Sequence, residues 1–175
     1  MKNIFLLLII SASLTSYADS ISDSMVYFNR GDAKLGLKDY KGAILDFDKV
    51  IALNPKYQYT YNRRGIAKDN AGDYKGAILD FDKAIELFPK DGVVYCNRGA
   101  TKFRSKDYKG ALMDFDKAIE LNPKYIKAYN DRGNVKKQLG DNAGAIKDYD
   151  KAIELNKVNS AVTIPKDSKN NKKLK

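Results

Sequence analysis

The chain has 175 residues, 43% of them hydrophobic and 31% charged, a balance that suits one ordinary globular domain and excludes a largely disordered chain. It has no histidine, no tryptophan and a single cysteine, Cys96, so a nucleophile paired with histidine, a zinc site and an internal disulfide are all excluded. The formal net charge of +10 is uneven, because five lysines and one aspartate lie in residues 158–175.

The first 18 residues have the pattern of a signal peptide. Lys2 precedes an apolar run, Ile4 to Ile10, and the small residues Ser16 and Ala18 follow it, which predicts cleavage after Ala18. The run is too short to remain as a membrane anchor, since spanning a bilayer takes about 20 apolar residues. The residue after the cut is Asp19 and not the cysteine that a bacterial lipoprotein acylates. We therefore expect an exported, periplasmic or secreted protein with no transmembrane segment in the mature chain.

After a short linker, residues 19–23, the chain repeats itself four times with a period of 34 residues. Asp73 to Pro89 reads DYKGAILDFDKAIELFP, and near-copies occupy Asp39–Pro55, Asp107–Pro123 and Asp141–Lys157. A glycine precedes each copy at the same distance: Gly31, Gly65, Gly99 and Gly133. A fixed period of this size indicates an array of stacked helical or β units.

Each copy is predicted to form an amphipathic helix. Ala77, Phe81 and Ile85 stand at i, i+4 and i+8 and therefore share one helix face. Each helix has an aspartate positioned to cap its first turn: Asp39, Asp73, Asp107 and Asp141. Prolines are expected to end the first three of these helices: Pro55, Pro89 and Pro123.

A second motif, a tyrosine four residues before the glycine, is expected to begin the first helix of each repeat. Glycine costs a helix interior about 1 kcal/mol relative to alanine, so its recurrence calls for a packing reason. We expect the two helices of a repeat to approach closely there, with the bulky Phe or Tyr of the second helix over the glycine.

These motifs resemble the tetratricopeptide repeat family. The resemblance covers Ser24 to Lys157 and implies an all-α, right-handed α-solenoid of four helix-turn-helix repeats, 24–57, 58–91, 92–125 and 126–157. It rests on the recurring glycines and prolines and on the following tyrosines, alanines and aromatic residues: Tyr27, Tyr61, Tyr95, Tyr129, Ala43, Ala77, Ala111, Ala145, Phe47, Phe81, Phe115, Tyr149, Ala84, Ala118 and Ala152. Val50 takes the place of the last alanine in the first copy.

One departure from the family is that every copy has an arginine directly before the glycine and a lysine three residues after it, as at Arg64 and Lys68, where the family often has a leucine and an aromatic residue. An aspartate also recurs on each second helix, as at Asp80. Arg64 and Asp80 could bridge the two helices of one repeat, or both could be solvated charges worth at most about 1 kcal/mol.

The last repeat differs from the others in ways that suggest the end of the array. Lys147 replaces the Leu45, Leu79 and Met113 of the earlier copies, and Asn142 replaces a tyrosine. We expect the fourth repeat to serve as its own cap, because a terminal repeat turns a polar face to water. Residues 158–175 are polar and are expected to form a basic, disordered tail. Two chains could instead pair end to end through the last repeat, as a homodimer.

The resemblance places the first helices on a concave face, where they would form a partner-binding groove. The residues implied are Phe28, Asp32, Leu35, Asn62, Ile66, Asp69, Cys96, Ala100, Phe103, Asn130, Asn134 and Lys137. Asparagines could bond a peptide backbone while aromatic and aliphatic side chains anchor apolar ones. Cys96 could equally be a small buried filler. Family members that bind a carboxylate need lysine, arginine and asparagine at places where this chain has Phe28, Asp32, Ile66, Cys96 and Ala100. We therefore do not expect this chain to bind a partner through a carboxylate.

Together these observations predict an exported, non-catalytic adaptor that binds a protein or peptide client, with no cofactor, no metal and no nucleic acid partner. No phosphate-binding glycine loop or Ser-x-x-Lys run is present, and the carboxylates do not cluster with calcium-loop spacing. The alternative is binding of an anionic lipid or polysaccharide surface by the lysines of residues 158–175.

Overall fold

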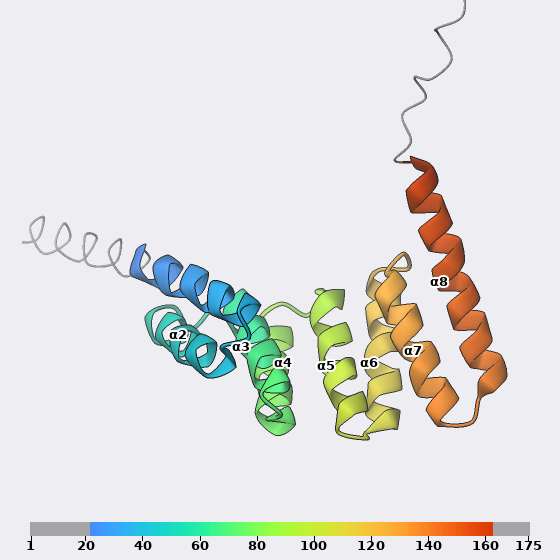
Figure 1. The fold of residues 1–175 in the computed structure, drawn as a ribbon, viewed down its shortest axis with the longest axis horizontal. Helices are drawn as coiled ribbons and strands as arrows, with labels where there is room; N and C mark the ends of the chain where they lie inside the picture. The colour runs from blue at the N-terminus through green and yellow to red at the C-terminus, as the bar shows by residue number, and fades with distance from the viewer. Residues whose placement is uncertain (1–21, 163–175) are drawn as a thin grey trace, which may run out of the picture.

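A computed structural model describes residues 22–162, and within that range all regular structure is helical (Figure 1). A first helix, residues 22–36, is followed by α2 (Tyr40–Leu53), α3 (Gln58–Asn70), α4 (Tyr74–Leu87), α5 (Gly92–Arg104), α6 (Tyr108–Leu121), α7 (Ile126–Gln138) and α8 (Asn142–Val162). The helices stack as successive pairs into an elongated array, which confirms the all-α solenoid. The expected signal peptide, residues 1–18, lies outside the described residues. Among the described helices none is long and apolar enough to cross a membrane.

Local sequence signals set the limits of the helices. The Asp73 carboxylate accepts a hydrogen bond from the Gly76 amide at 2.9 Å, and the three equivalent aspartates cap their helices in the same way. Second helices α2, α4 and α6 each end two residues before the proline. First helices α3, α5 and α7 begin three residues before their tyrosine, as at Gln58 and Tyr61, so the tyrosine motif lies within the first helix and does not begin it.

The turn between the two helices of each repeat has one residue with a left-handed backbone. Gly72 and Gly140 occupy it in the second and fourth repeats, with φ of 87° and 85°. Lys38 and Lys106 occupy it in the other two, with φ of 63° and 66°. Because such a conformation costs a side-chain-bearing residue about 1 kcal/mol or more, the turn geometry is imposed by the packing of the two helices.

Each repeat has a phenylalanine or tyrosine of the second helix packed directly on the glycine of the first. Phe81 is 1% exposed, and a Cβ added to Gly65 would lie 2.8 Å from its Cε1 atom. The expected close approach is thereby confirmed, and the same geometry recurs at Gly31, Gly99 and Gly133. At Gly31, Gly65 and Gly99 the aromatic ring is fully buried in close-packed surroundings, so a side chain at the glycine would displace it.

A buried ion-pair cluster joins the two helices of each repeat. Nε and Nη2 of Arg64 donate to the two carboxylate oxygens of Asp80 at 2.8 and 2.6 Å, and Nζ of Lys68 lies 2.8 Å from the same carboxylate. Asp80 is only 4% exposed. The ion pair between Arg64 and Asp80, one of two alternatives in the sequence analysis, is therefore formed. Equivalent clusters occur in the other repeats: Arg30–Asp46–Lys34, Arg98–Asp114–Lys102 and Arg132–Asp148–Lys136.

The same arginines also join each repeat to the one before it. Nη1 of Arg64 donates to Asp48 of the first repeat at 2.6 Å, and Arg98–Asp82 and Arg132–Asp116 repeat the contact. The guanidinium of Arg64 also lies over the ring of Tyr61, 5.7 Å from its centroid. One planar side chain with five donors thus organises both the helix pair and the stacking of repeats. We call these linked contacts the arginine ladder.

The C-terminal end of the array differs from expectation in two respects. Leu45, Leu79 and Met113 are 65%, 69% and 72% exposed, so no following repeat covers these positions and Lys147 carries no capping signal. Helix α8 also continues to Val162, past the expected end of the repeats at residue 157. The proposed basic tail therefore starts in a helix, and residues 163–175 lie outside the described range.

The packed glycines make a testable prediction. Gly65→Ala should destabilise the fold by about 1 to 3 kcal/mol, since the new methyl group would collide with the ring of Phe81. Gly36→Ala is the matched control, because a Cβ on Gly36 would meet nothing within 4 Å and should be neutral or slightly stabilising. Urea unfolding of both variants measures the difference, and equal effects would contradict the packing.

Acid titration tests the arginine ladder. Burial alone would raise the pKa of Asp148, but hydrogen bonds from Arg132 and Lys136 outweigh it and hold the pKa below its ordinary value of 3.8. The ladder's stabilisation is therefore present above about pH 4 and is lost as the pH falls further. Asp148→Asn should lower the urea midpoint at about pH 7, and its deficit should shrink at about pH 3. Glu120→Gln, at a 67% exposed carboxylate, should show no such change; a constant deficit for Asp148→Asn would contradict the account.

Candidate functional site

The first helices lie on the inner side of the array. Helix α3 contacts α5, and α5 contacts α7, whereas no two second helices of neighbouring repeats contact each other among α2 to α8. Helices that meet across a repeat boundary are closer together than those that do not, so the array curves toward its first helices. This geometry gives α3, α5 and α7 a common concave face.

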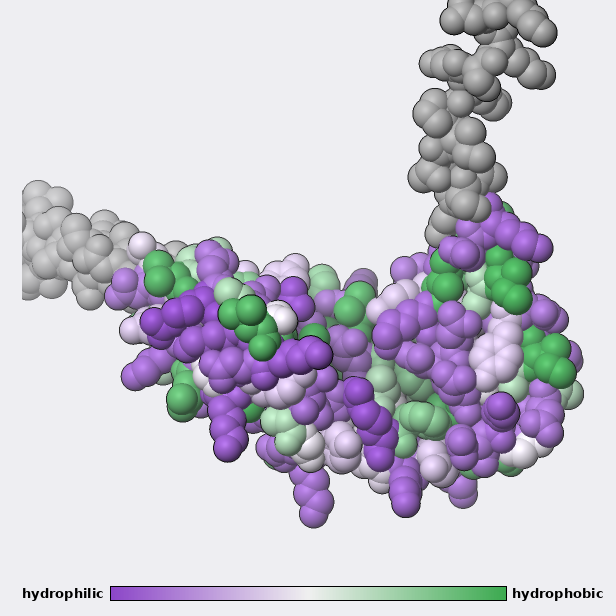
Figure 2. Space-filling model, in the orientation of Figure 1, coloured by the Kyte–Doolittle hydropathy of each residue, from purple (hydrophilic) through white to green (hydrophobic). Residues whose placement is uncertain are grey.

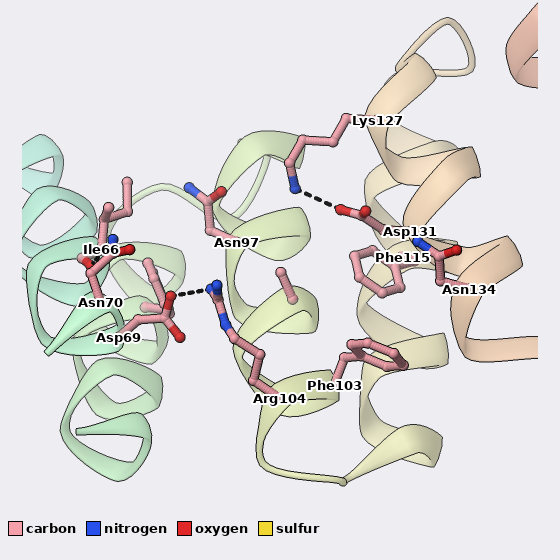
Figure 3. Close-up of a pocket in the computed structure, with 12 residues that line it drawn as sticks. Ile66, Asp69, Asn70, Asn97, Phe103, Arg104, Phe115, Lys127, Asp131 and Asn134 are labelled. Atoms are coloured by element: carbon pink, nitrogen blue, oxygen red, sulfur yellow. Dashed lines mark hydrogen bonds and ion pairs between the residues drawn. The ribbon is translucent and has the colours of Figure 1, made fainter. Parts of the chain in front are cut away.

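A cavity of about 360 Å³ opens on that face between α3, α5 and α7 (Figure 3). Phe81 and Phe115 of the second helices contribute to its lining, together with Ile66, Ala100 and Phe103 of the first helices. Polar side chains complete the lining: Asp69, Asn70, Asn97, Arg104, Lys127, Asp131 and Asn134. An apolar interior with a few convergent polar groups is the usual composition of a binding pocket.

The charged side chains around this cavity are already paired. Arg104 of α5 binds Asp69 of α3, and Nζ of Lys127 lies 2.6 Å from Asp131 on its own helix (Figure 3). The Asn97 amide also donates to the Asn62 side chain at 3.0 Å. Two cations and two carboxylates balance, so the cavity carries no large net charge and does not select an ionic ligand.

Five of the twelve expected groove residues come together in the cavity lining: Ile66, Asp69, Ala100, Phe103 and Asn134. Asn62 lies next to them through its bond to Asn97. Asp69 is 6% exposed and its Oδ1 atom has no hydrogen-bond partner among the described residues. Asn134 is exposed, and its side-chain oxygen accepts from the Tyr149 hydroxyl at 2.8 Å.

The expected residues of the first repeat are used in packing. The ring of Phe28 lies 5.9 Å from that of Phe47 and 5.4 Å from that of Tyr57, measured between centroids. Leu35 packs against the core around Phe47, and Asp32 forms an ion pair with Arg63 at 3.1 Å. None of the three lines the cavity.

Cys96 lies beneath the concave surface and not on it. Its side chain is fully buried in the core with Phe115 and Val135, so the role of buried filler is confirmed and direct contact with a partner is precluded. Burial raises the pKa of the thiol, which keeps it protonated and unreactive. Asn130 and Lys137 are exposed on α7 and lie outside the cavity lining.

The sequence reasoning missed five of the seven polar residues in the lining: Asn70, Asn97, Arg104, Lys127 and Asp131. The sequence did contain a signal for the pairing of Asp69 with Arg104, because these opposite charges are separated by one period plus one residue. The same offset relates Asn62 to Asn97. Adjacent first helices therefore face each other one residue out of phase. No group of three potential metal-binding side chains occurs within the described range.

A curved array of helix hairpins with a lined concave face defines a helical-repeat protein of the kind that supports protein interactions. Residues 24–57 and 58–91 match one tetratricopeptide repeat model, and residues 93–125 and 126–157 match a second. The chain therefore belongs to the tetratricopeptide repeat family. No curated protein matches the chain.

Several solved structures share the fold. MamA has a TM-score of 0.75 at 20% identity, with 83% of this chain and 87% of that one covered. MamA from Desulfovibrio magneticus RS-1 has a TM-score of 0.72 at 25% identity, with 78% and 77% covered. The first repeat domain of Spaghetti (RPAP3), solved with the HSP90 peptide SRMEEVD, has a TM-score of 0.66 at 22% identity, with 68% and 94% covered. Below 25% identity, such likeness establishes the fold alone.

Proposed function

We propose that this protein is an exported, non-catalytic adaptor that binds an extended segment of a protein partner along its concave face. The observation that carries the proposal is the cavity between α3, α5 and α7, which combines an apolar interior with amide side chains at its edge. An apolar side chain of the partner would enter between Ile66 and Phe103. Asn70 and Asn134 would bond the neighbouring peptide groups.

The charge pattern of the face narrows the class of partner. Asp69 with Arg104 and Lys127 with Asp131 leave no cation unpaired in the cavity lining. The RPAP3 domain was solved with a peptide that ends in an aspartate, whereas Phe28, Asp32 and Ile66 here stand at places where carboxylate-binding members of the family have basic or amide side chains. The partner of this chain is therefore an internal, apolar peptide segment and not a chain terminus.

The proposal of export rests on the signal-like pattern of residues 1–18. The proposal that the protein is not an enzyme rests on the side chains that line the cavity. The polar groups around the cavity are amides and paired ions, and none is a nucleophile next to a base. The cavity therefore supports binding and no bond-breaking step.

Photo-crosslinking in the native host tests the proposal. A photoreactive residue at Asn70, exposed at the edge of the cavity, should yield a discrete adduct with one partner. The same residue at Met113, 72% exposed on second helix α6, is the control and should yield none. Phe103→Ala should reduce the Asn70 adduct about tenfold, the usual effect of losing an aromatic anchor; a thermal melt of that variant confirms that it is folded.

Adducts of equal yield at Asn70 and Met113, or at Met113 alone, would contradict groove binding. Undiminished adduct in a folded Phe103→Ala variant would exclude this cavity as the anchor point. Loss of partner capture on deleting residues 163–175, with Phe103→Ala unaffected, would favour the lysine-rich tail instead.

A further inference from the structure

The interface between consecutive repeats uses the same four positions at every boundary. The second helix contributes two half-buried aliphatic residues, as Ile78 and Ile85 do in α4. The following first helix contributes two residues that this contact buries almost completely, as at Val94 and Thr101, which are 3% and 0% exposed. The equivalent pairs at the other two boundaries are Thr60 with Ala67 and Ala128 with Val135, all of them 0% exposed.

Both ends of the described array keep these interface residues but leave them uncovered. On α8, the equivalents Ile146 and Ile153 are 59% and 53% exposed, and Figure 2 shows apolar surface over α8 at this end of the array. On the first helix, Val26 is 60% exposed and Ala33 is also exposed. A terminal repeat built as a cap would carry polar residues at these positions. The two ends instead carry the two halves of an interior interface.

The arginine ladder is also incomplete at both ends, in complementary ways. The Arg30 side chain is 55% exposed, whereas Arg64, Arg98 and Arg132 are 17%, 17% and 18% exposed. No carboxylate among the described residues meets Nη1 of Arg30, the atom that in the other repeats binds the preceding repeat. Asp150 stands where Asp48, Asp82 and Asp116 stand, and within the described chain no cation pairs with it.

We propose that the uncovered face of α8 binds the first helix of a second copy of this chain. Asp150 would accept from Nη1 of the second copy's Arg30, and Ile146 and Ile153 would cover its Val26 and Ala33. The contact reproduces the interior interface in both its apolar part and its ion pair. It is head-to-tail, so the two surfaces differ and copies add without closing into a symmetric pair. The stack would extend the concave face from one molecule to the next.

The association is expected to be reversible and concentration dependent. Interior repeats are held side by side by a short covalent loop, which gives their contact a high effective concentration. Separate copies must offset the loss of translational and rotational freedom. High salt should weaken the contact through Arg30 and Asp150, whose charges are solvent-exposed before docking.

Sedimentation of the natural chain, as its host processes it, tests the proposal with two surface variants. Val26→Asp disables the N-terminal face, and Ile153→Asp disables the C-terminal face; both side chains are exposed, so neither change should affect folding. The unaltered chain should form larger species as its concentration rises, and each variant alone should remain monomeric. An equimolar mixture of the two variants should form a one-to-one dimer and nothing larger, because only one intact pair of faces remains.

Three outcomes would overturn the proposal. A monomer at every soluble concentration would mean that the end faces do not associate. Dimers of Val26→Asp alone would indicate a symmetric pairing of two C-terminal faces. Mixed variants that stay monomeric, while the unaltered chain associates, would place the contact elsewhere on the surface. None of these outcomes bears on client capture by the cavity, which the crosslinking measures separately.

Discussion

The pairing of the two helices in each described repeat depends on one buried aspartate. Asp114, 3% exposed, is held by two hydrogen bonds from Arg98 and by the ammonium group of Lys102. Burying a charge is costly unless its hydrogen bonds are complete, so the second helix can dock on the first only where all these contacts form. The same arginine reaches Asp82 of the preceding repeat, and the contact that joins two helices therefore also aligns two repeats.

This use of basic residues shapes the concave face. Although the chain carries a net charge of +10, the arginine and lysine that recur at the same two places of each first helix pair with an aspartate of the second helix. The cavity is left with balanced ion pairs, amides and rings such as Phe103. A basic composition thus coexists with a binding surface suited to apolar peptide segments. The array curves toward its first helices because α3 contacts α5 and α5 contacts α7.

The repeat period was enough to predict the helices, their aspartate caps and the packing of Phe81 on Gly65, because these depend on residues close in sequence or in a fixed register. The groove was harder to predict. Asp69 meets Arg104 only because adjacent first helices are offset by one residue, and this offset depends on how the repeats pack. Exposure also misled the sequence reasoning: Leu79 is 69% exposed within the array, so the lysine at its equivalent in the last repeat says nothing about where the array ends.

A double-mutant cycle between Arg98 and Asp114 measures the central interaction most directly. Arg98→Met leaves the buried Asp114 carboxylate with Lys102 as its one remaining partner, and Asp114→Leu leaves Arg98 with Asp82 alone. The double variant removes both members of the pair. If the ladder holds the repeats as described, urea unfolding should give a coupling free energy of at least about 1.5 kcal/mol. Effects that add to within about 0.5 kcal/mol would show that the two side chains stabilise the protein independently, which would contradict the ladder as the organising contact.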